Sequence, residues 1–414
     1  MPISPPAFAT RLLPISLGQV VGMGCGILGV QISSHLITPA DYGEYGLYLS
    51  LTPLGMWVVH AGLIKSTGRY WGESASRAQL LHELWPAFIH KLPWLTAAVA
   101  VMSVLMMRQN EWFGFGLLLV TAALFSATAI AQAALQSAQE NWRDFAVTST
   151  SSITRTLLPP IIYVAAGGTA SALYAGLGLH ALLVATLAAL MLRPYWSNSR
   201  PTQPPQLTPI YNGPLFAGLA LVGWIMAGLN RWIVAAFFGT ATAGYFVLAG
   251  NIALIAAGLL GSIFTQYFQP ALFAAPHHTT VERRALAQRV DRIALGYNIL
   301  ALTGLALLRL IAPWFIGGLI NENYRASLPY IMPAGFFLTA TLTHSFYHTM
   351  LVAGQREKAC GPVDLSFAGL LAIGSVTTAA LGGEIWWQFW LLAAPLFSAI
   401  LSRSLARFYL LQPT

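Results

Sequence analysis

Apolar runs of about 20 residues recur along the whole of this 414-residue chain. An α-helix needs a run of about that length to cross the hydrocarbon core of a bilayer. Charged residues make up only 8% of the sequence, whereas soluble globular proteins contain about 25%, so the chain has too little charge to cover a water-facing surface. A transmembrane β-barrel would instead show alternating segments of about 10 residues. The sequence therefore predicts an all-α integral membrane protein.

The apolar runs predict twelve transmembrane helices. A stiff, proline-rich linker at 194–213 separates them into an N-terminal six-helix bundle, 1–193, and a C-terminal six-helix bundle, 214–414. The predicted spans are 12–33, 44–64, 91–107, 112–136, 145–166, 170–192, 214–238, 243–266, 293–316, 327–351, 363–381 and 385–406.

The two halves resemble internal copies. The segment Ile32–Gly43 aligns with Ile233–Gly244 at a constant offset of 201 residues, and the same offset relates spans one to three with spans seven to nine. Each half has six spans, an even number, so both repeats begin on the same side of the membrane and run parallel. Transporters built in this way place their substrate between the halves. The layout predicts two bundles around a central cavity that works by alternating access.

The lysine and arginine distribution predicts the orientation. Twelve spans place both chain ends on the same side of the membrane. That side has sixteen lysines and arginines, and the other side has two, Arg108 and Arg325. Because basic residues are retained in cytoplasmic loops, both termini are predicted to be cytoplasmic. The net charge of +8 then reflects topology and contact with anionic lipid headgroups, so we expect no nucleic-acid partner.

The turn after the first span contains a recognisable pattern. Leu36–Leu51, LITPADYGEYGLYLSL, resembles a stretch of the bacterial polysaccharide-biosynthesis membrane proteins, which are lipid-linked oligosaccharide (O-antigen type) flippases of the multidrug/oligosaccharidyl-lipid/polysaccharide exporter superfamily. Asn230–Tyr245 is similar to a second stretch of that family, with Asn230 where the family often has aspartate. In the first stretch, Asp41 is expected to cap a helix, and the three tyrosines Tyr42, Tyr45 and Tyr48 are expected to anchor it at the membrane interface.

The resemblance implies a function. A protein of this family would move an undecaprenyl-pyrophosphate-linked oligosaccharide from the cytoplasmic to the outer leaflet of the bacterial inner membrane, for cell-surface polysaccharide synthesis. It would work without a cofactor, among membrane lipids and alongside polysaccharide assembly proteins.

Three arginines lie inside apolar spans: Arg155, Arg231 and Arg309. An arginine at the centre of a membrane helix costs roughly 2.5–3.5 kcal/mol, and the nearest acidic residues, Asp364 among them, fall at predicted span ends. Guanidinium groups bind phosphate through two parallel hydrogen bonds, so the arginines are candidates for binding the pyrophosphate. The alternatives are that each snorkels to the interface, bonds helix carbonyls or pairs with a carboxylate.

Uncharged polar residues inside the spans are a second group of candidates. Their amides can hydrogen-bond sugar hydroxyls, or they can join neighbouring helices through hydrogen bonds. These residues are Gln19, Gln132, Asn230, Asn251 and Asn298.

His344 and His348 lie four residues apart, on one face of the tenth span. This spacing can hold a metal ion, but two ligands alone make a poor site, so no metal is predicted. Hydrogen bonding between helices and proton coupling are the two remaining interpretations, since histidine titrates near neutrality.

Two other functions compete with the flippase. A multidrug or other small-molecule exporter of the same superfamily would carry acidic residues in its cavity for cations, and the deep charges here are basic. A membrane enzyme such as a polysaccharide polymerase or ligase would carry a large outer loop with polar catalytic residues. No nucleophile–base pair occurs in the sequence, so we expect a transporter and not an enzyme.

Overall fold

A computed structural model describes residues 5–71, 77–106, 112–195, 213–273, 279–354 and 356–412. These residues are almost wholly helical, and they contain no strand beyond one isolated bridge, Ile316 to Ile320. Among them, five helices are long and apolar enough to cross a membrane: Ser16–Leu36, Gly114–Ser137, Ala170–Tyr195, Thr280–Phe315 and Cys360–Leu411. The chain is a multi-pass membrane protein, as its composition predicts.

Two compact units make up the chain. Unit 1 consists of Met1–Ile32 and Tyr48–Leu221, and unit 2 consists of Ser33–Leu47 and Val222–Thr414. The turn between the first two helices thus belongs to the unit formed by the second half of the chain. Most of the predicted linker lies outside the described residues, so a division of the chain there stays a prediction.

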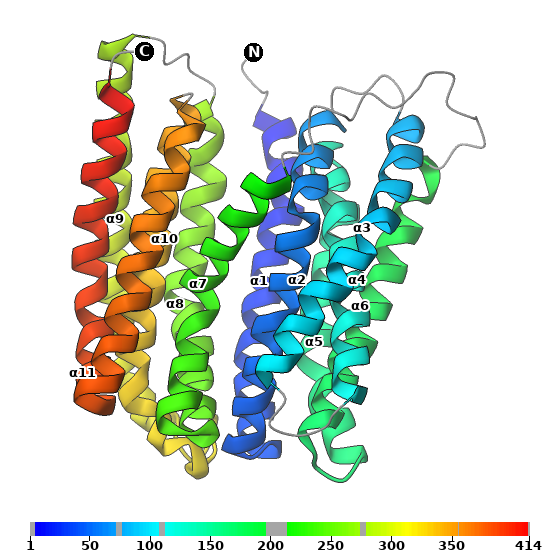
Figure 1. Ribbon diagram of the computed structural model, residues 1–414, viewed down its shortest axis with the longest axis vertical. Helices are drawn as coiled ribbons and strands as arrows, with labels where there is room; N and C mark the ends of the chain where they lie inside the picture. Colours follow the sequence, from blue (N-terminus) through cyan, green and yellow to red (C-terminus); the bar gives the residue numbers. More distant parts are fainter. Residues whose placement is uncertain are drawn as a thin grey trace. The chain divides into compact units, whose positions relative to one another are not determined.

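The helices that contribute to unit 1 are α1 to α6, and in this unit α6 packs against both α4 and α5 (Figure 1). Leu135, Val147 and Val184 are fully buried in its core, together with Trp71 at the end of α2. The helices are α1 (Pro5–Leu36), α2 (Pro39–Tyr70), α3 (Arg77–Met106), α4 (Trp112–Ser137), α5 (Asn141–Ala165) and α6 (Ala170–Leu192).

In unit 2, α10 packs against α8, α9 and α11 (Figure 1). Tyr297, Met350 and Val363 are buried among these helices. The helices that contribute to this unit are α7 (Gly213–Phe238), α8 (Thr240–Phe273), α9 (Thr280–Ile311), the short 3-10 helix η4 (Glu322–Tyr330), α10 (Ile331–Ala353) and α11 (Cys360–Leu411).

Helix α11 reverses direction at Gly383, which has a φ of 69° and a ψ of −162°. Asp364 and Ser402 both reach the ring of His344, at 3.0 and 2.9 Å. In a straight helix two residues separated by 38 positions would be about 57 Å apart. The two halves of α11 therefore fold back on each other. Only glycine adopts this backbone conformation easily, which explains why the predicted spans 363–381 and 385–406 are separate.

The turn between α1 and α2, Ser33–Leu47, is here called the elbow. Thr38 caps α2, since its hydroxyl accepts from the backbone N–H of Asp41 at 3.2 Å and donates to the Asp41 carboxylate at 2.7 Å. The cap is therefore the threonine, and not Asp41 as expected. Tyr42, Tyr45 and Tyr48 are 4%, 7% and 1% exposed, so they are core residues and not interfacial anchors.

Two glycines allow the elbow to cross α8. A Cβ on Gly43 would overlap the carbonyl oxygen of Thr240, and a Cβ on Gly244 would overlap the carbonyl oxygen of Pro39. Pro39 and Thr240 each lie four residues before the glycine of their own helix, so the contact is symmetrical. Because Gly43 and Gly244 are 201 positions apart, the predicted repeat offset pairs the two residues that meet in the structure.

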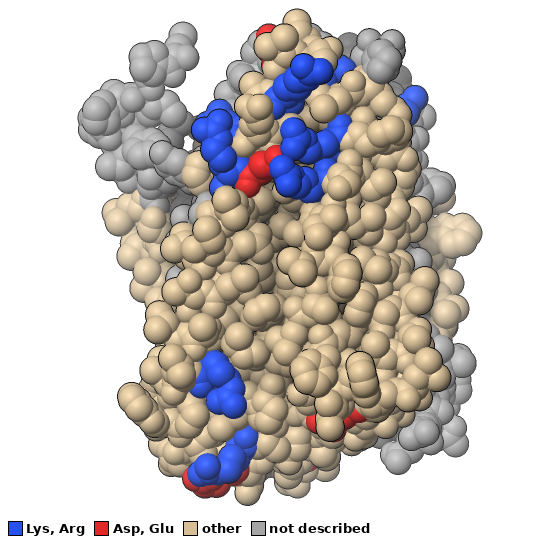
Figure 2. Space-filling view, turned by 90° about the vertical axis from the view of Figure 1, so that its left-hand side faces the viewer, with Lys and Arg blue, Asp and Glu red and all other residues tan. Residues whose placement is uncertain are grey.

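Charge on unit 2 gathers at the ends of its helices (Figure 2). At one end Arg403 and Arg407 of α11 contact Asp291 of α9 at 3.1 and 3.2 Å, and at another Arg325 pairs with Glu322. Figure 2 shows charged residues near the top and in the lower part of this face, with an uncharged surface across the middle, as expected for a face that meets lipid.

Candidate functional site

The middle of α5 is unusually polar for a membrane helix. Seven of the nine residues from Thr148 to Thr156 carry a hydroxyl, and the segment also contains Arg155. We call this stretch the α5 polar segment. Sequence reasoning singled out its arginine but missed the hydroxyls around it, although their density was a readable signal.

Neighbouring helices hold part of this segment in place. Thr156 of α5 donates to the carbonyl of Cys25 in α1 at 3.2 Å, and Thr148 accepts from Gln132 of α4 at 3.1 Å. The Thr154 hydroxyl donates to the Thr150 carbonyl and lies 2.7 Å from Nδ1 of His180 in α6. Three helices thus fix the backbone of α5 here, while most of its hydroxyl side chains stay half-exposed.

Arg155 lies near the middle of α5. It is the fifteenth of the 25 residues of α5, about 3 Å past the helix centre, and its side chain is exposed on the unit. No carboxylate in the described part of the chain forms an ion pair with it. The guanidinium group therefore has donors available to an anion.

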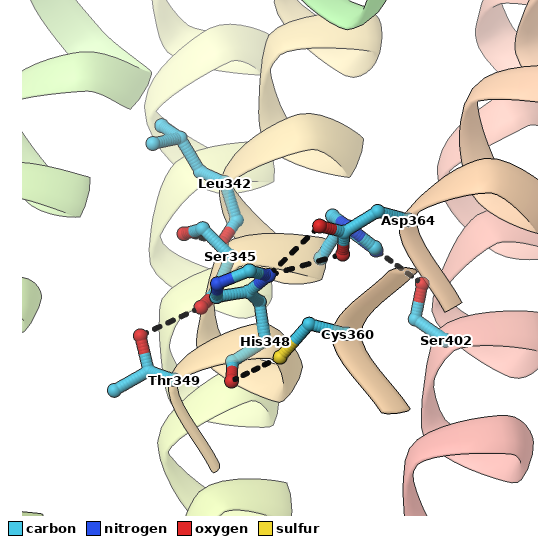
Figure 3. A network of polar contacts seen from close by, with 8 residues as sticks. Leu342, Ser345, His348, Thr349, Cys360, Asp364 and Ser402 are labelled. Atoms are coloured by element: carbon cyan, nitrogen blue, oxygen red, sulfur yellow. Dashed lines mark hydrogen bonds and ion pairs between the residues drawn. The ribbon is translucent and has the colours of Figure 1, made fainter. Parts of the chain in front are cut away.

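A buried cluster in unit 2 joins α10 to both halves of α11 (Figure 3). We call it the His–Asp cluster: His344, His348, Asp364 and Ser402. The Asp364 carboxylate contacts Nε2 of His344 at 3.0 Å and Nδ1 of His348 at 3.0 Å, and Nδ1 of His344 contacts the Ser402 hydroxyl at 2.9 Å. The two histidines do share one helix face, as their spacing predicts.

Asp364 lies near the end of its span, as predicted, but packing buries it against both histidines. It is 4% exposed and lies four residues inside α11. A buried carboxylate is costly unless it is paired and hydrogen-bonded, and the two imidazoles supply both. No group of three or more His, Cys, Asp or Glu among the described residues is arranged to hold a metal ion.

The other two arginines occupy different surroundings from Arg155. Arg309 lies in the last turn of α9, where the C-terminal end of the helix dipole favours a cation. A 3-10 helix, Ala312–Phe315, continues the path of α9, so the helical span reaches Phe315, and a contact of Arg309 with the substrate stays a prediction. Arg231 of α7 donates from Nη1 to the carbonyl of Gly46 in the elbow at 3.3 Å, which is the helix-carbonyl alternative.

Among the amide candidates, three bind other helices. Gln132 donates to Thr148, Asn251 of α8 to the hydroxyl of Tyr42 in the elbow at 2.8 Å, and Asn298 of α9 to Thr343 of α10 at 2.9 Å. Asn230 is 5% exposed, and its Oδ1 is buried without a hydrogen-bond partner. Gln19 is half-buried on α1.

The fold recurs in solved transporter structures. A lipid II flippase, MurJ, in an inward closed conformation matches with a TM-score of 0.66 at 11% identity, over 97% of this chain and 87% of that one. An inward-facing multidrug resistance MATE transporter of the MOP superfamily matches with a TM-score of 0.61 at 14% identity, over 96% and 98%. A mutant of the Vibrio cholerae MATE transporter VcmN matches with a TM-score of 0.60 at 12% identity, over 96% and 95%.

No protein-family model and no curated protein matches the sequence. At these identities the solved structures establish the fold. The chain therefore has the helical fold shared by these flippase and exporter structures.

Proposed function

We propose that this protein moves an undecaprenyl-pyrophosphate-linked oligosaccharide from the cytoplasmic to the outer leaflet of the bacterial inner membrane by alternating access between two six-helix bundles. The α5 polar segment is the observation that carries this proposal. It combines an exposed mid-helix guanidinium with a row of hydroxyls, and the cargo combines phosphate with sugar. The fold shared with a lipid II flippase supports a substrate of the same general chemistry.

The chemistry of the segment fits an anionic, sugar-bearing headgroup. The planar guanidinium of Arg155 matches two phosphate oxygens, and such charge-assisted pairs are the strongest hydrogen bonds that a side chain makes. The half-exposed hydroxyls of the segment donate and accept in the manner of sugar hydroxyls. The polyprenyl tail stays in lipid, where it needs no protein partner.

Other candidates contribute to different degrees. Gln19 and Asn230 retain unassigned hydrogen-bonding capacity and remain proposed substrate contacts, with the orphaned Oδ1 of Asn230 the clearer case. Four other candidates already donate hydrogen bonds to other parts of the protein: Gln132, Asn251, Asn298 and Arg231. Their first role is to position helices, and any contact with substrate would be additional.

A small-molecule exporter is the second candidate function. The fold shared with multidrug MATE transporters favours it, and the buried carboxylate of Asp364 is the kind of group that an exporter of cations needs. Arg155 opposes it, because a guanidinium group near the helix centre repels a cationic drug.

A reconstitution experiment separates the two functions. Purified protein in liposomes is given either a polyprenyl-pyrophosphate-linked N-acetylglucosamine with a fluorescent label on the sugar, or the cationic dye ethidium. We expect the labelled lipid to become accessible to a membrane-impermeant quencher faster than in protein-free liposomes, and ethidium movement to stay at background. Ethidium transport without lipid translocation would refute the flippase and establish the exporter.

A further inference from the structure

The net charge of the His–Asp cluster depends on whether one of its two imidazoles carries an extra proton. The Asp364 carboxylate is buried and accepts hydrogen bonds from both histidines, with Nδ1 of His348 at 3.0 Å from each of its oxygens. With both imidazoles neutral the cluster carries one buried negative charge. With one imidazole protonated it is neutral, and the large cost of a buried unpaired charge is removed.

His344 is fully satisfied as a neutral ring. Its Nε2–H donates to Asp364, and its Nδ1 accepts from the Ser402 hydroxyl at 2.9 Å. The tautomer follows from these partners. The ring is also 3% exposed and stacks on Phe367 at 4.0 Å between centroids. These contacts hold the ring in place beside Asp364, so this histidine positions the carboxylate.

His348 differs from its neighbour in its exposure. Its Nδ1 faces Asp364 and the Cys360 side chain also interacts with it, but the His348 side chain is 35% exposed, against 3% for His344. A proton can therefore reach Nε2 while Nδ1–H keeps its contact with the carboxylate. His348 lies five residues before the end of α10, about 8 Å along the axis, at the end that the charge bias predicts to be cytoplasmic.

Among the other titratable groups packed against α10, the Cys360 side chain interacts with His348. On α9, Asp291 is occupied by Arg403, Arg407 and the hydroxyl of Tyr347, and the Tyr297 hydroxyl donates to a carbonyl of α8. At the start of α11, the Cys360 thiol lies 4.0 Å from the His348 carbonyl oxygen. The described part of α8 contains no charged residue.

We propose that the His–Asp cluster is a proton-binding site, in which Nε2 of His348 takes up and releases the proton, Asp364 holds the counter-charge, and His344 and Ser402 are positioning residues. Removing the proton leaves a charged carboxylate between two neutral rings, which weakens the hold of α10 on both halves of α11. The two protonation states therefore favour different packings of α10 against α11. Coupling of this change to transport rests on the proposed function, whereas proton binding itself does not.

Proton binding is tested first, without transport. Protein with ¹⁵N-labelled histidine is placed in lipid nanodiscs, and the imidazole signals are followed by NMR from about pH 5 to about pH 9. Among the nine labelled histidines, we expect one titration step to belong to His348, to be lost in His348→Gln and to be displaced by about one pH unit or more in Asp364→Asn. The exposed-histidine control His90→Gln should leave it unchanged. A His348 signal that does not titrate, or that titrates identically in Asp364→Asn, would overturn the proposal.

Transport supplies the second test and separates a proton site from a merely structural ion pair. In the liposome assay with the labelled lipid, an imposed pH gradient should change the wild-type rate. In His348→Gln and in His348→Lys the ratio of rates with and without the gradient should fall to about one, since neither side chain titrates near neutrality. Lysine keeps a cation beside Asp364 and should preserve thermal stability, so it remains informative if glutamine unfolds the protein.

The two proposals fail in different ways. Wild-type protein that moves the lipid equally with and without a gradient, or a His348→Lys variant that keeps the gradient response, would overturn the coupling and leave the flippase intact. Wild-type protein that never moves the lipid would overturn the flippase, while the NMR titration would still decide proton binding.

Discussion

Replacing Arg155 by alanine is expected to lower the rate of lipid-linked sugar translocation by roughly 100-fold. Two charge-assisted hydrogen bonds of about 1.5 kcal/mol each sum to about 3 kcal/mol, which corresponds to about two powers of ten. Arg155→Lys should retain an intermediate rate, because lysine keeps the charge but loses the bidentate geometry. The measurement is the initial rate of quencher accessibility of the labelled lipid in proteoliposomes.

Arg309→Ala is the matched control for this experiment. It removes the same side chain from another membrane helix, but from the last turn of α9 and not from the middle of a polar segment. We expect its rate to stay within about twofold of wild type, as is usual for a residue at a helix end that makes no buried contact. Equal losses in the two variants, or a fully active Arg155→Ala protein that is correctly folded, would contradict the role given to the α5 polar segment.

Adding one methyl group at Gly43 is expected to destabilise unit 2 by about 2–3 kcal/mol or more, the range for overpacking a tight contact. The new Cβ would overlap the backbone carbonyl of Thr240, and backbone cannot move aside as a flexible side chain can. The elbow would have to separate from α8 and strain its contacts to Tyr324, Asn251 and Arg231. The free energy of unfolding in mixed detergent micelles measures this effect.

Gly62→Ala is the control in the same helix, because no atom of the described residues lies within 4 Å of the Cβ that it adds. It should be neutral or slightly stabilising, as alanine is the better helix former. Gly244→Ala should match Gly43→Ala, since the crossing is symmetrical. The double variant should cost less than the sum of the two, because the first methyl group already forces the helices apart. Strict additivity would show that the two glycines do not share one contact.

Much of the fold follows from local sequence. Uninterrupted apolar runs leave a chain in lipid no alternative to helix, since every backbone N–H and C=O must be bonded internally. Within the described residues, the predicted spans accordingly lie in helical segments to within one residue. The break in α11 could also be predicted from the sequence, because Gly382 and Gly383 separate two apolar runs. The end of the ninth span was predicted less exactly: α9 ends at Ile311, five residues before the predicted end at 316, and a 3-10 helix continues the path to Phe315.

The candidate sites show the limit of that reasoning. Arg155 was identified because a charge is expensive at the middle of a membrane helix wherever it points. The hydroxyls around it did not indicate a site, because a single serine or threonine can hydrogen-bond the backbone of its own helix. For Asp364 the position near a span end predicted an interfacial residue, but tertiary packing places it against two histidines 20 and 16 positions earlier in the chain.

The sequence by itself determined that this protein spans the membrane with helices, and it predicted a repeat at an offset of 201 residues and an anionic partner for the basic residues inside the spans. Tertiary structure alone decided which repeat positions meet, Gly43 with Gly244, and which polar groups are already satisfied. It also brought His344, His348, Asp364 and Ser402 into one cluster. The physical reason is that hydropathy and periodicity act within a helix, whereas hydrogen-bond partners and close contacts depend on how helices distant in sequence pack together.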